Sequence, residues 1–507
     1  MAAAGAAPAA ASKTKKLEYD ALGKALYYLV SFIEGYDQQV LSMCMRAFEL
    51  TLGFSQSQLS TLATVSTMSR MGCCIIWGLL GDEHDSNHVL AAGLLLMGIV
   101  SICLSSASHY KVILFLRFLH GFGFACVYPV QQKIVAESTS SEENKTQEAV
   151  ETTAPQTPTT SGGGQKRKKK KSNSIFTHLQ ALNCIGRLLC AVITTIIARK
   201  VLLGYYGWRT SYVIIGYVWI LFGVGIEFGM KLRECTSSDG ESSSAQIVAP
   251  KETKLHDSLA GAAHAVFTRP TALISIFTLF IAEAPMCAFN YMTIYLQYLG
   301  VSDTMAGVAI AITLIGGAAG SGAGGYIIEK IADIKDGYGE LGSGIAVMVV
   351  RLVVSLLFFL GKPPCGKLLW YHYVELATLG GTLVTVGGVD RAVMKEVIED
   401  KYQGTASAMV RTISGITSSV ILFQVSAYLT EKVFGYVPSR ESFETMDTIV
   451  KEQNAEALRK SMMYIIMAGT ALNTICYISM FFKYTEDKED ANKGNTGQDA
   501  SATQAQQ

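Results

Sequence analysis

Residues 117–125 read Arg-Phe-Leu-His-Gly-Phe-Gly-Phe-Ala, and they stand inside an apolar run that continues to Val130. A guanidinium at mid-depth of a membrane costs at least about 2.5 kcal/mol, so Arg117 should face the interior of a helix bundle. Gly121 and Gly123 add a surface on which a second helix can approach closely. This stretch therefore predicts a membrane-spanning helix that packs inside a bundle.

The composition of the whole chain agrees with a membrane protein. Of its 507 residues, 50% are hydrophobic and 16% are charged, whereas soluble domains average about 25% charged residues. The 42 Lys and Arg nearly balance the 41 Asp and Glu, which gives a formal net charge of +1. These values exclude a disordered chain, a coiled coil and collagen, and they argue against an ordinary soluble enzyme.

Twelve apolar runs are long enough for the roughly 20 residues that a membrane-spanning helix needs. In the first half of the chain we expect spans near 25–45, 59–80, 89–107, 112–130, 176–198 and 211–230. In the second half we expect them near 271–295, 305–327, 342–360, 368–389, 404–429 and 462–482. The predicted fold class is an all-α integral membrane protein with twelve transmembrane helices in two six-helix halves.

Polar segments divide the chain into successive regions. We predict a disordered cytosolic N-terminus (1–24), an N-terminal six-helix bundle (25–230, the N-half) with a disordered cytosolic insert (137–174), a cytosolic interdomain linker (231–266), a C-terminal six-helix bundle (267–482, the C-half) and a disordered cytosolic tail (483–507). Segments rich in Ser, Thr, Glu and Pro bury too little apolar surface to fold. Lys and Arg are in excess on the side that holds both termini, which indicates cytosolic termini.

The insert ends in six consecutive basic residues, Lys166 to Lys171. Such a cluster beside a membrane helix can contact anionic lipid. Alternatively, the cluster only sets the topology, because basic residues remain on the cytosolic side.

A short motif occurs at matching places in the two halves. Gly78 is followed four residues later by Asp82, and Gly325 is followed by Glu329 and Lys330. Residues four apart lie on one helix face, so the glycine admits a neighbouring helix that the acid can then bond. The repetition indicates two related halves.

These motifs resemble those of the major facilitator superfamily. The stretch 78–82 resembles the loop signature of that superfamily, and 117–125 resembles its fourth-helix signature. The resemblance implies that the repeated motif residues, Gly78, Asp82, Gly325, Glu329 and Lys330, form part of a gate between the halves. Within the superfamily the chain is similar to the Spinster-like branch, in pieces over 25–135 and 175–485. It departs from the pattern where Glu83 and Gln38 stand in place of basic residues.

The resemblance implies a secondary active transporter that works by alternating access. For the Spinster-like branch it implies a small amphiphilic solute, such as a lysophospholipid or a sphingoid phosphate, and a monomeric protein. We expect the membrane to be the plasma membrane or that of an acidic endomembrane organelle. We expect no cofactor and no nucleic-acid partner. We also expect no metal ion, since no Cys or His spacing matches a metal site.

Two acidic residues, Glu34 and Asp37, lie one helical turn apart in the first span. Two carboxylates at that depth repel each other, so one of them would hold a proton more readily than in water. The resemblance implies that the first and fourth helices line the cavity, which makes Arg117 the expected counter-ion. We therefore predict a proton or substrate site here. The alternative is a structural ion pair that sets the helix register.

Four other polar residues are candidates for the same site. His120 follows Arg117 by one turn and can titrate in the physiological range. Arg187 could bind an anionic head group, and Glu283 and Asn290 would supply the C-half wall. Each could instead be ordinary packing or a structural pair.

Two further interpretations concern other parts of the C-half. Arg351 and Glu375, in neighbouring spans, suggest a mutual ion pair. The segment 431–460 reads as a long outer loop between the last two spans, and part of it could be an amphipathic surface helix.

The main alternatives remain within membrane proteins. A transporter of a small polar nutrient, meaning a sugar, an organic acid or an amino acid, would use the same fold. A transport-inactive receptor is favoured only by the altered loop after Asp82. An enzyme has least support, because the sequence contains neither a phosphate-binding loop nor a nucleophile elbow.

Overall fold

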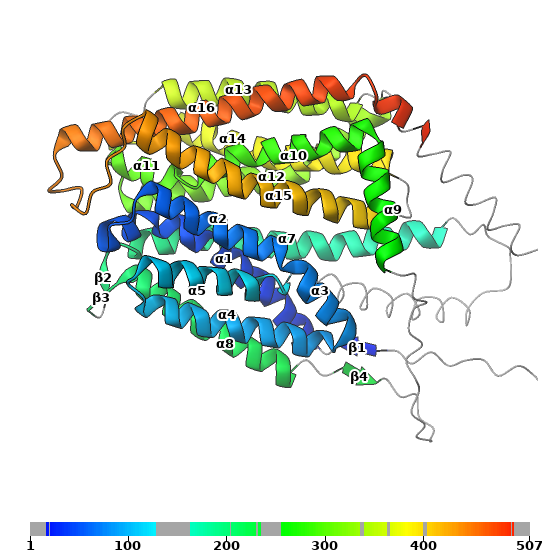
Figure 1. Ribbon diagram of the computed structural model, residues 1–507, viewed down its shortest axis with the longest axis horizontal. Helices are drawn as coiled ribbons and strands as arrows, with labels where there is room; N and C mark the ends of the chain where they lie inside the picture. Colours follow the sequence, from blue (N-terminus) through cyan, green and yellow to red (C-terminus); the bar gives the residue numbers. More distant parts are fainter. Residues whose placement is uncertain are drawn as a thin grey trace, which may run out of the picture.

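The computed structural model describes residues 17–19, 21–127, 163–202, 204–229, 232–234, 255–334, 339–361, 366–398, 403–487 and 489–490. These residues are almost entirely helical, and most of the helices run along a common direction (Figure 1). Within them, 8 helices are long and apolar enough to cross a membrane. The predicted all-α integral membrane fold is confirmed.

The helices follow the predicted division into two halves. Those of the N-half are α1 (Ala21–Leu52), α2 (Gln56–Gly72), α3 (Cys74–Glu83), α4 (Ser86–Ser106), α5 (Tyr110–Phe124), α7 (Gly163–Ile197) and α8 (Gly207–Gly229). Those of the C-half are α10 (Pro270–Phe289), α11 (Met292–Tyr298), α12 (Asp303–Ile334), α13 (Gly339–Leu360), α14 (Trp370–Val397), α15 (Gln403–Tyr428), the π-helical turn η1 (Leu429–Val433) and α16 (Thr448–Met480). Among the described residues, each predicted span overlaps one of these helices or two consecutive ones.

The two halves lie against each other along their length, with the N-half below and the C-half above in Figure 1. Helix α9 (Leu255–Thr268) lies across one end of the bundle, which we call the α9 end. Helix α11 lies at the opposite end, the α11 end, beside the connection from η1 to α16.

Two small antiparallel strand pairs complete the described structure. Strand β1 (Leu17–Tyr19) pairs with β4 (Leu232–Glu234), so that Leu17 is opposite Glu234. Strand β2 (Val201–Leu202) pairs with β3 (Tyr205–Tyr206) in a hairpin between α7 and α8.

Several polar segments are more ordered than predicted. Residues 163–174 were expected in the disordered insert but belong to α7, while 128–162 lie outside the described residues. Lys, Arg and Gln favour helix, so a basic run can extend a helix although it cannot be buried. The N-terminal segment predicted to be disordered contains β1, and the predicted interdomain linker contains β4 and most of α9. The outer loop is also shorter than predicted, because α16 already begins at Thr448.

Local capping explains where the helices at the α11 end begin and end. Helix α1 stops at Gly53, whose φ of +72° suits glycine. Ser55 and Gln58 then form a capping box: the Ser55 Oγ accepts from the Gln58 N–H at 3.2 Å, and the Gln58 Oε1 accepts from the Ser55 N–H at 3.0 Å. The turn between α1 and α2 is therefore tight.

Helices α1 and α7 touch through their backbones. A Cβ built on Gly35 would stand 1.9 Å from the Asn183 carbonyl oxygen, and one built on Gly186 would stand 1.9 Å from the Phe32 carbonyl oxygen. Only glycine permits this approach. The contact brings the polar side chains of α1 and α7 together at mid-depth.

The substitution Gly35→Ala tests this contact. The added methyl group meets backbone that cannot rotate away, so we expect a loss of at least about 1–3 kcal/mol of stability, the usual range for overpacking. The measurement is thermal unfolding of the purified protein in detergent. Gly342→Ala is the matched control, because a Cβ there meets nothing within 4 Å. Equal unfolding temperatures for the two variants would contradict the close contact.

Candidate functional site

A cavity of about 190 Å³ lies where the two halves meet. Its walls come from α1, α2, α5 and α7 of the N-half and from α10 and α15 of the C-half. The predicted site residues that line it are Asp37, Arg117, His120, Arg187, Glu283 and Asn290. Residues chosen from four separate helices, with Asn290 directly after the last of them, are thus brought to one place.

Asp37 is buried in the wall of this cavity, with 4% of its surface exposed. Its Oδ2 accepts a hydrogen bond from the Trp219 indole Nε1 at 2.7 Å and lies 3.0 Å from the His120 Nε2. His120 is equally buried. A buried carboxylate needs such partners, and here a titratable imidazole is one of them.

Arg117 does not form the predicted ion pair with Asp37, which His120 contacts instead. The Arg117 guanidinium lies over the Tyr212 ring, 5.7 Å from its centroid. Its Nε and Nη1 have no hydrogen-bond partner among the described residues. An Arg of this kind at a cavity wall retains donors for an anionic ligand.

Glu34 is absent from the cavity lining but is connected to it by hydrogen bonds. Its Oε1 accepts from the Gln38 Nε2 at 3.0 Å, and the Gln38 Oε1 accepts from the Arg187 Nη2. Arg187 also donates from Nε to the Asn183 Oδ1 at 3.0 Å. The first-span carboxylates therefore belong to two networks, one through His120 and one through Arg187.

Arg70 of α2 is a site residue that the sequence analysis missed. It lines the cavity, lies 5.4 Å from the centroid of the Phe124 ring, and interacts electrostatically with Glu34, Arg187 and Glu283. The sequence does contain a feature that could have identified it, because Arg70, like Arg117, is a charged residue inside an apolar run. With Arg70 the cavity has three arginines in its wall.

The C-half wall of the cavity is less charged. Glu283, Met286 and Asn290 come from the end of α10, which contains Pro285 and stops at Phe289. Ser418 and Phe423 come from α15. One side of the cavity is therefore cationic, and the other is mixed polar and apolar.

The two repeated motifs lie on helices toward the α9 end. Gly78 and Asp82 belong to α3, and Gly325, Glu329 and Lys330 belong to α12. The side chains of Asp82, Glu329 and Lys330 lie outside the described part of the chain, and so do those of 166–171. Their predicted gating and lipid contacts remain predictions.

The predicted pair between Arg351 and Glu375 is wrong. Arg351 donates from Nη2 to the Thr382 carbonyl at 2.6 Å, two turns farther along α14 than Glu375. Arg351 interacts electrostatically with Asp390, whose carboxylate accepts from the Tyr477 hydroxyl at 2.7 Å. This cluster is buried within the C-half, away from the cavity lining.

Comparisons with known proteins match this chain to one family by sequence profile and to solved transporters by fold. A sequence profile of the Major Facilitator Superfamily matches residues 27–148 and 167–422. A bacterial homologue of the human lysosomal transporter Spinster, in an inward-facing and unoccupied conformation, has a TM-score of 0.72 at 14% identity, over 92% of this chain and 98% of that chain. A search of curated protein sequences gives no match.

Transporters of polar solutes have the same fold. The nucleoside transporter NupG has a TM-score of 0.60 at 12% identity, over 91% of this chain and 99% of that chain. A D-xylose–proton symporter has a TM-score of 0.55 at 13% identity, over 88% of this chain and 96% of that chain. At these identities the likeness concerns the fold alone.

The substitution Trp219→Phe tests the partners of Asp37. It removes one hydrogen bond to a buried carboxylate, so we expect a loss of about 1.5–3 kcal/mol of stability. The measurement is again thermal unfolding in detergent. Trp370→Phe is the control, because Trp370 is 77% exposed, and it should change stability by less than about 0.5 kcal/mol. A Trp219→Phe variant as stable as this control would count against the bond.

Proposed function

The chain belongs to the major facilitator superfamily, and we propose that it carries a small anionic amphiphile through the cavity between its halves, with proton coupling. Members of this superfamily are multi-pass membrane transporters that work by alternating access. The observation that carries the proposal is the grouping of Arg70, Arg117 and Arg187 with the buried Asp37 around one central cavity.

The substrate class follows from the chemistry of the cavity wall. Three guanidinium groups suit a phosphate head, which accepts several charge-assisted hydrogen bonds. Leu41 and Phe124 add apolar surface on the same wall, and Phe423 adds it on the opposite, C-half wall. A volume of about 190 Å³ suits a head group, so the tail of a lysophospholipid or a sphingoid phosphate would extend beyond the cavity. The similarity in fold to the Spinster homologue is in keeping with this class.

Proton coupling is assigned to Asp37 and His120. When Asp37 takes up a proton, its attraction for a charged His120 is lost, and the ties between α1, α5 and α8 weaken. Glu34 offers a second carboxylate through Gln38 and Arg187. A change of charge at the boundary between the halves can bias the two openings of the transporter.

A small polar solute is the second candidate. Gln38, Gln39, Ser66 and Thr67 line the cavity with neutral hydrogen-bonding groups, which would suit a sugar or a nucleoside. In a transport-inactive receptor, the same charges would only set the helix register.

We place the α9 end in the cytosol, and a proton gradient would be available at the plasma membrane or in an acidic organelle.

The deciding experiment is uptake into proteoliposomes that contain the purified protein. Radiolabelled lysophospholipids, sphingoid phosphates, sugars, nucleosides and amino acids are compared with and without an inward-acid pH gradient. Gradient-dependent flux of a lipid supports the proposal. Flux of a polar solute instead would support the second candidate, a transporter of small polar solutes. Binding of a lipid without flux would favour the transport-inactive receptor.

The substitution Asp37→Asn should abolish gradient-driven uptake while the protein still folds. Asparagine keeps the size of the side chain but cannot take up and release the proton. The readouts are initial uptake rates and the elution profile of the purified variant. Asp85→Asn is the control, since the Asp85 side chain is 86% exposed at the α9 end. An unchanged pH dependence in Asp37→Asn would remove Asp37 from the coupling step.

The substitution Arg70→Gln should weaken binding of a phosphate-bearing substrate. We expect KM to rise by about tenfold or more, as for the loss of one hydrogen bond to a charged group. Uptake measured over a range of substrate concentrations gives this value. Lys111→Gln, at an exposed position of α5, is the matched loss of a positive charge. If both variants bind equally well, Arg70 does not contact the substrate.

A further inference from the structure

The connection between η1 and α16 crosses the α11 end of the bundle, and we call its residues 434–447 the strap. Its first part is attached to the C-half. Asn454 of α16 accepts from the Val437 N–H at 2.8 Å and donates to the Val437 carbonyl at 2.8 Å, and the Tyr436 N–H bonds the Thr430 carbonyl at 3.0 Å. The strap must therefore move with the C-half.

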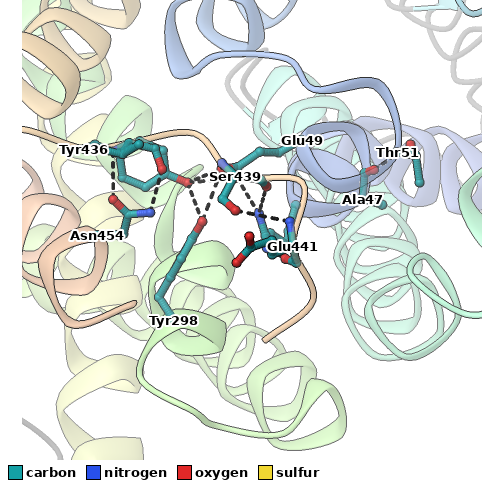
Figure 2. Close-up of polar contacts among 10 residues, drawn as sticks. Ala47, Glu49, Thr51, Tyr298, Tyr436, Ser439, Glu441 and Asn454 are labelled. Carbon is teal, nitrogen blue, oxygen red and sulfur yellow. Dashed lines mark hydrogen bonds and ion pairs between the residues drawn. The ribbon is translucent and has the colours of Figure 1, made fainter. Parts of the chain in front are cut away.

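The strap binds a fully buried carboxylate of the N-half. Glu49, near the end of α1, has 0% of its surface exposed. It accepts from the Tyr436 hydroxyl at 2.8 and 2.9 Å, from the Ser439 N–H at 3.0 Å and from the Tyr298 hydroxyl of α11 at 3.2 Å (Figure 2). All three donors belong to the C-half, so these bonds join the two halves.

Arg46, one turn before Glu49, binds the backbone of the same segment. It forms an ion pair with Glu49 at 3.2 Å. It also donates to the Ser439 carbonyl at 2.9 Å and to the Glu441 carbonyl at 2.7 Å. Its guanidinium lies 4.6 Å from the centroid of the Phe443 ring. The charged pair on α1 thus contacts four residues of the strap and one residue, Tyr298, of α11.

Two further ties close the same end. Arg199 at the end of α7 binds both oxygens of Asp303 at the start of α12, at 2.7 and 2.8 Å. Arg440 of the strap donates to the Leu52 carbonyl of α1 at 2.8 Å. These bonds, too, run from one half to the other.

We infer that the strap is a lid that closes the cavity at the α11 end, and that Glu49 and Arg46 are its latch. The inference rests on the proposed transport cycle, in which the α11 end must part. When the halves separate, Glu49 and Arg46 remain on α1 while their partners leave with the C-half. A buried charge without a partner is strongly destabilising, so the latch can open only together with entry of water.

The latch and the proton site share one helix. Glu49 follows Asp37 by twelve residues on α1, which corresponds to about 18 Å along the axis at 1.5 Å per residue. A shift of α1 that follows a change of charge at Asp37 would reach the latch directly. The lid is therefore placed to respond to the occupancy of the cavity.

The test measures how well the lid excludes a reagent. Ser60 of α2 is fully buried and hydrogen-bonded to the Tyr291 hydroxyl of the C-half, so Ser60→Cys reports on the interface behind the strap. The full-length protein in lipid nanodiscs is treated with a bulky hydrophilic maleimide, and labelling at position 60 is followed by peptide mass spectrometry. This readout is specific to one position and requires no substrate.

In this background Glu49→Gln should raise the labelling rate by about tenfold or more, since Arg46 loses its counter-ion and one of the two accepting oxygens becomes an NH2 donor. Tyr436→Phe removes only one donor and should raise it by about two- to fivefold. Glu452→Gln, an exposed carboxylate of α16, should leave the rate unchanged.

The outcomes separate the lid from the transport proposal. Labelling that is the same in Glu49→Gln, Tyr436→Phe and Glu452→Gln, each monodisperse after purification, overturns the lid even if the protein transports a solute. Labelling that rises in the first two alone supports the lid even if the uptake panel shows no flux. If Glu49→Gln does not fold, the comparison of Tyr436→Phe with Glu452→Gln decides.

Discussion

Ionised side chains are costly in the hydrocarbon interior of a membrane, and this cost organises both polar centres of the molecule. At mid-depth, Asp37 is held by Trp219 and His120. At the α11 end, Glu49 is held by Arg46 and by three donors of the C-half. In each case the charge is retained because other helices bring it partners, so the charge can be kept only while those helices stay in place.

Helix α1 carries both centres, and its position depends on small residues. Gly35 and Gly186 let the backbones of α1 and α7 touch, which brings Arg187 to Gln38 beside the cavity. A bulkier pair would separate the helices and leave these polar groups without partners. Close backbone packing is therefore a condition for the electrostatics of the cavity, since hydrogen bonds act only over short distances.

The two centres differ in what they can do. Around the cavity, Arg117 has donors without partners among the described residues, so this centre is incomplete and can accept a ligand. At the latch, in contrast, both oxygens of the Glu49 carboxylate accept hydrogen bonds. An unfilled centre favours binding, whereas a filled one favours a single conformation. This contrast is what the cycle of a carrier with two openings requires.

Much of the site could be predicted from charges inside apolar runs. That signal indicates Asp37, Arg117 and Arg187. Arg70 has the same property and could have been identified in the same way. The signal could not indicate Trp219, because an indole in an apolar run is ordinary. It led to the wrong partner for Arg351, since adjacent helices were identified while the depth of Glu375 along α14 was not.

The membrane environment, the all-α class and the relation between the halves can be read from the chain alone, because hydrophobic runs and short motifs are local properties. Which buried polar groups meet is a property of the folded protein. Those meetings depend on the rotation and depth of each helix, as with His120 at Asp37 and Tyr436 at Glu49. Rotation and depth are set by packing between residues far apart in the chain, and no local pattern records them.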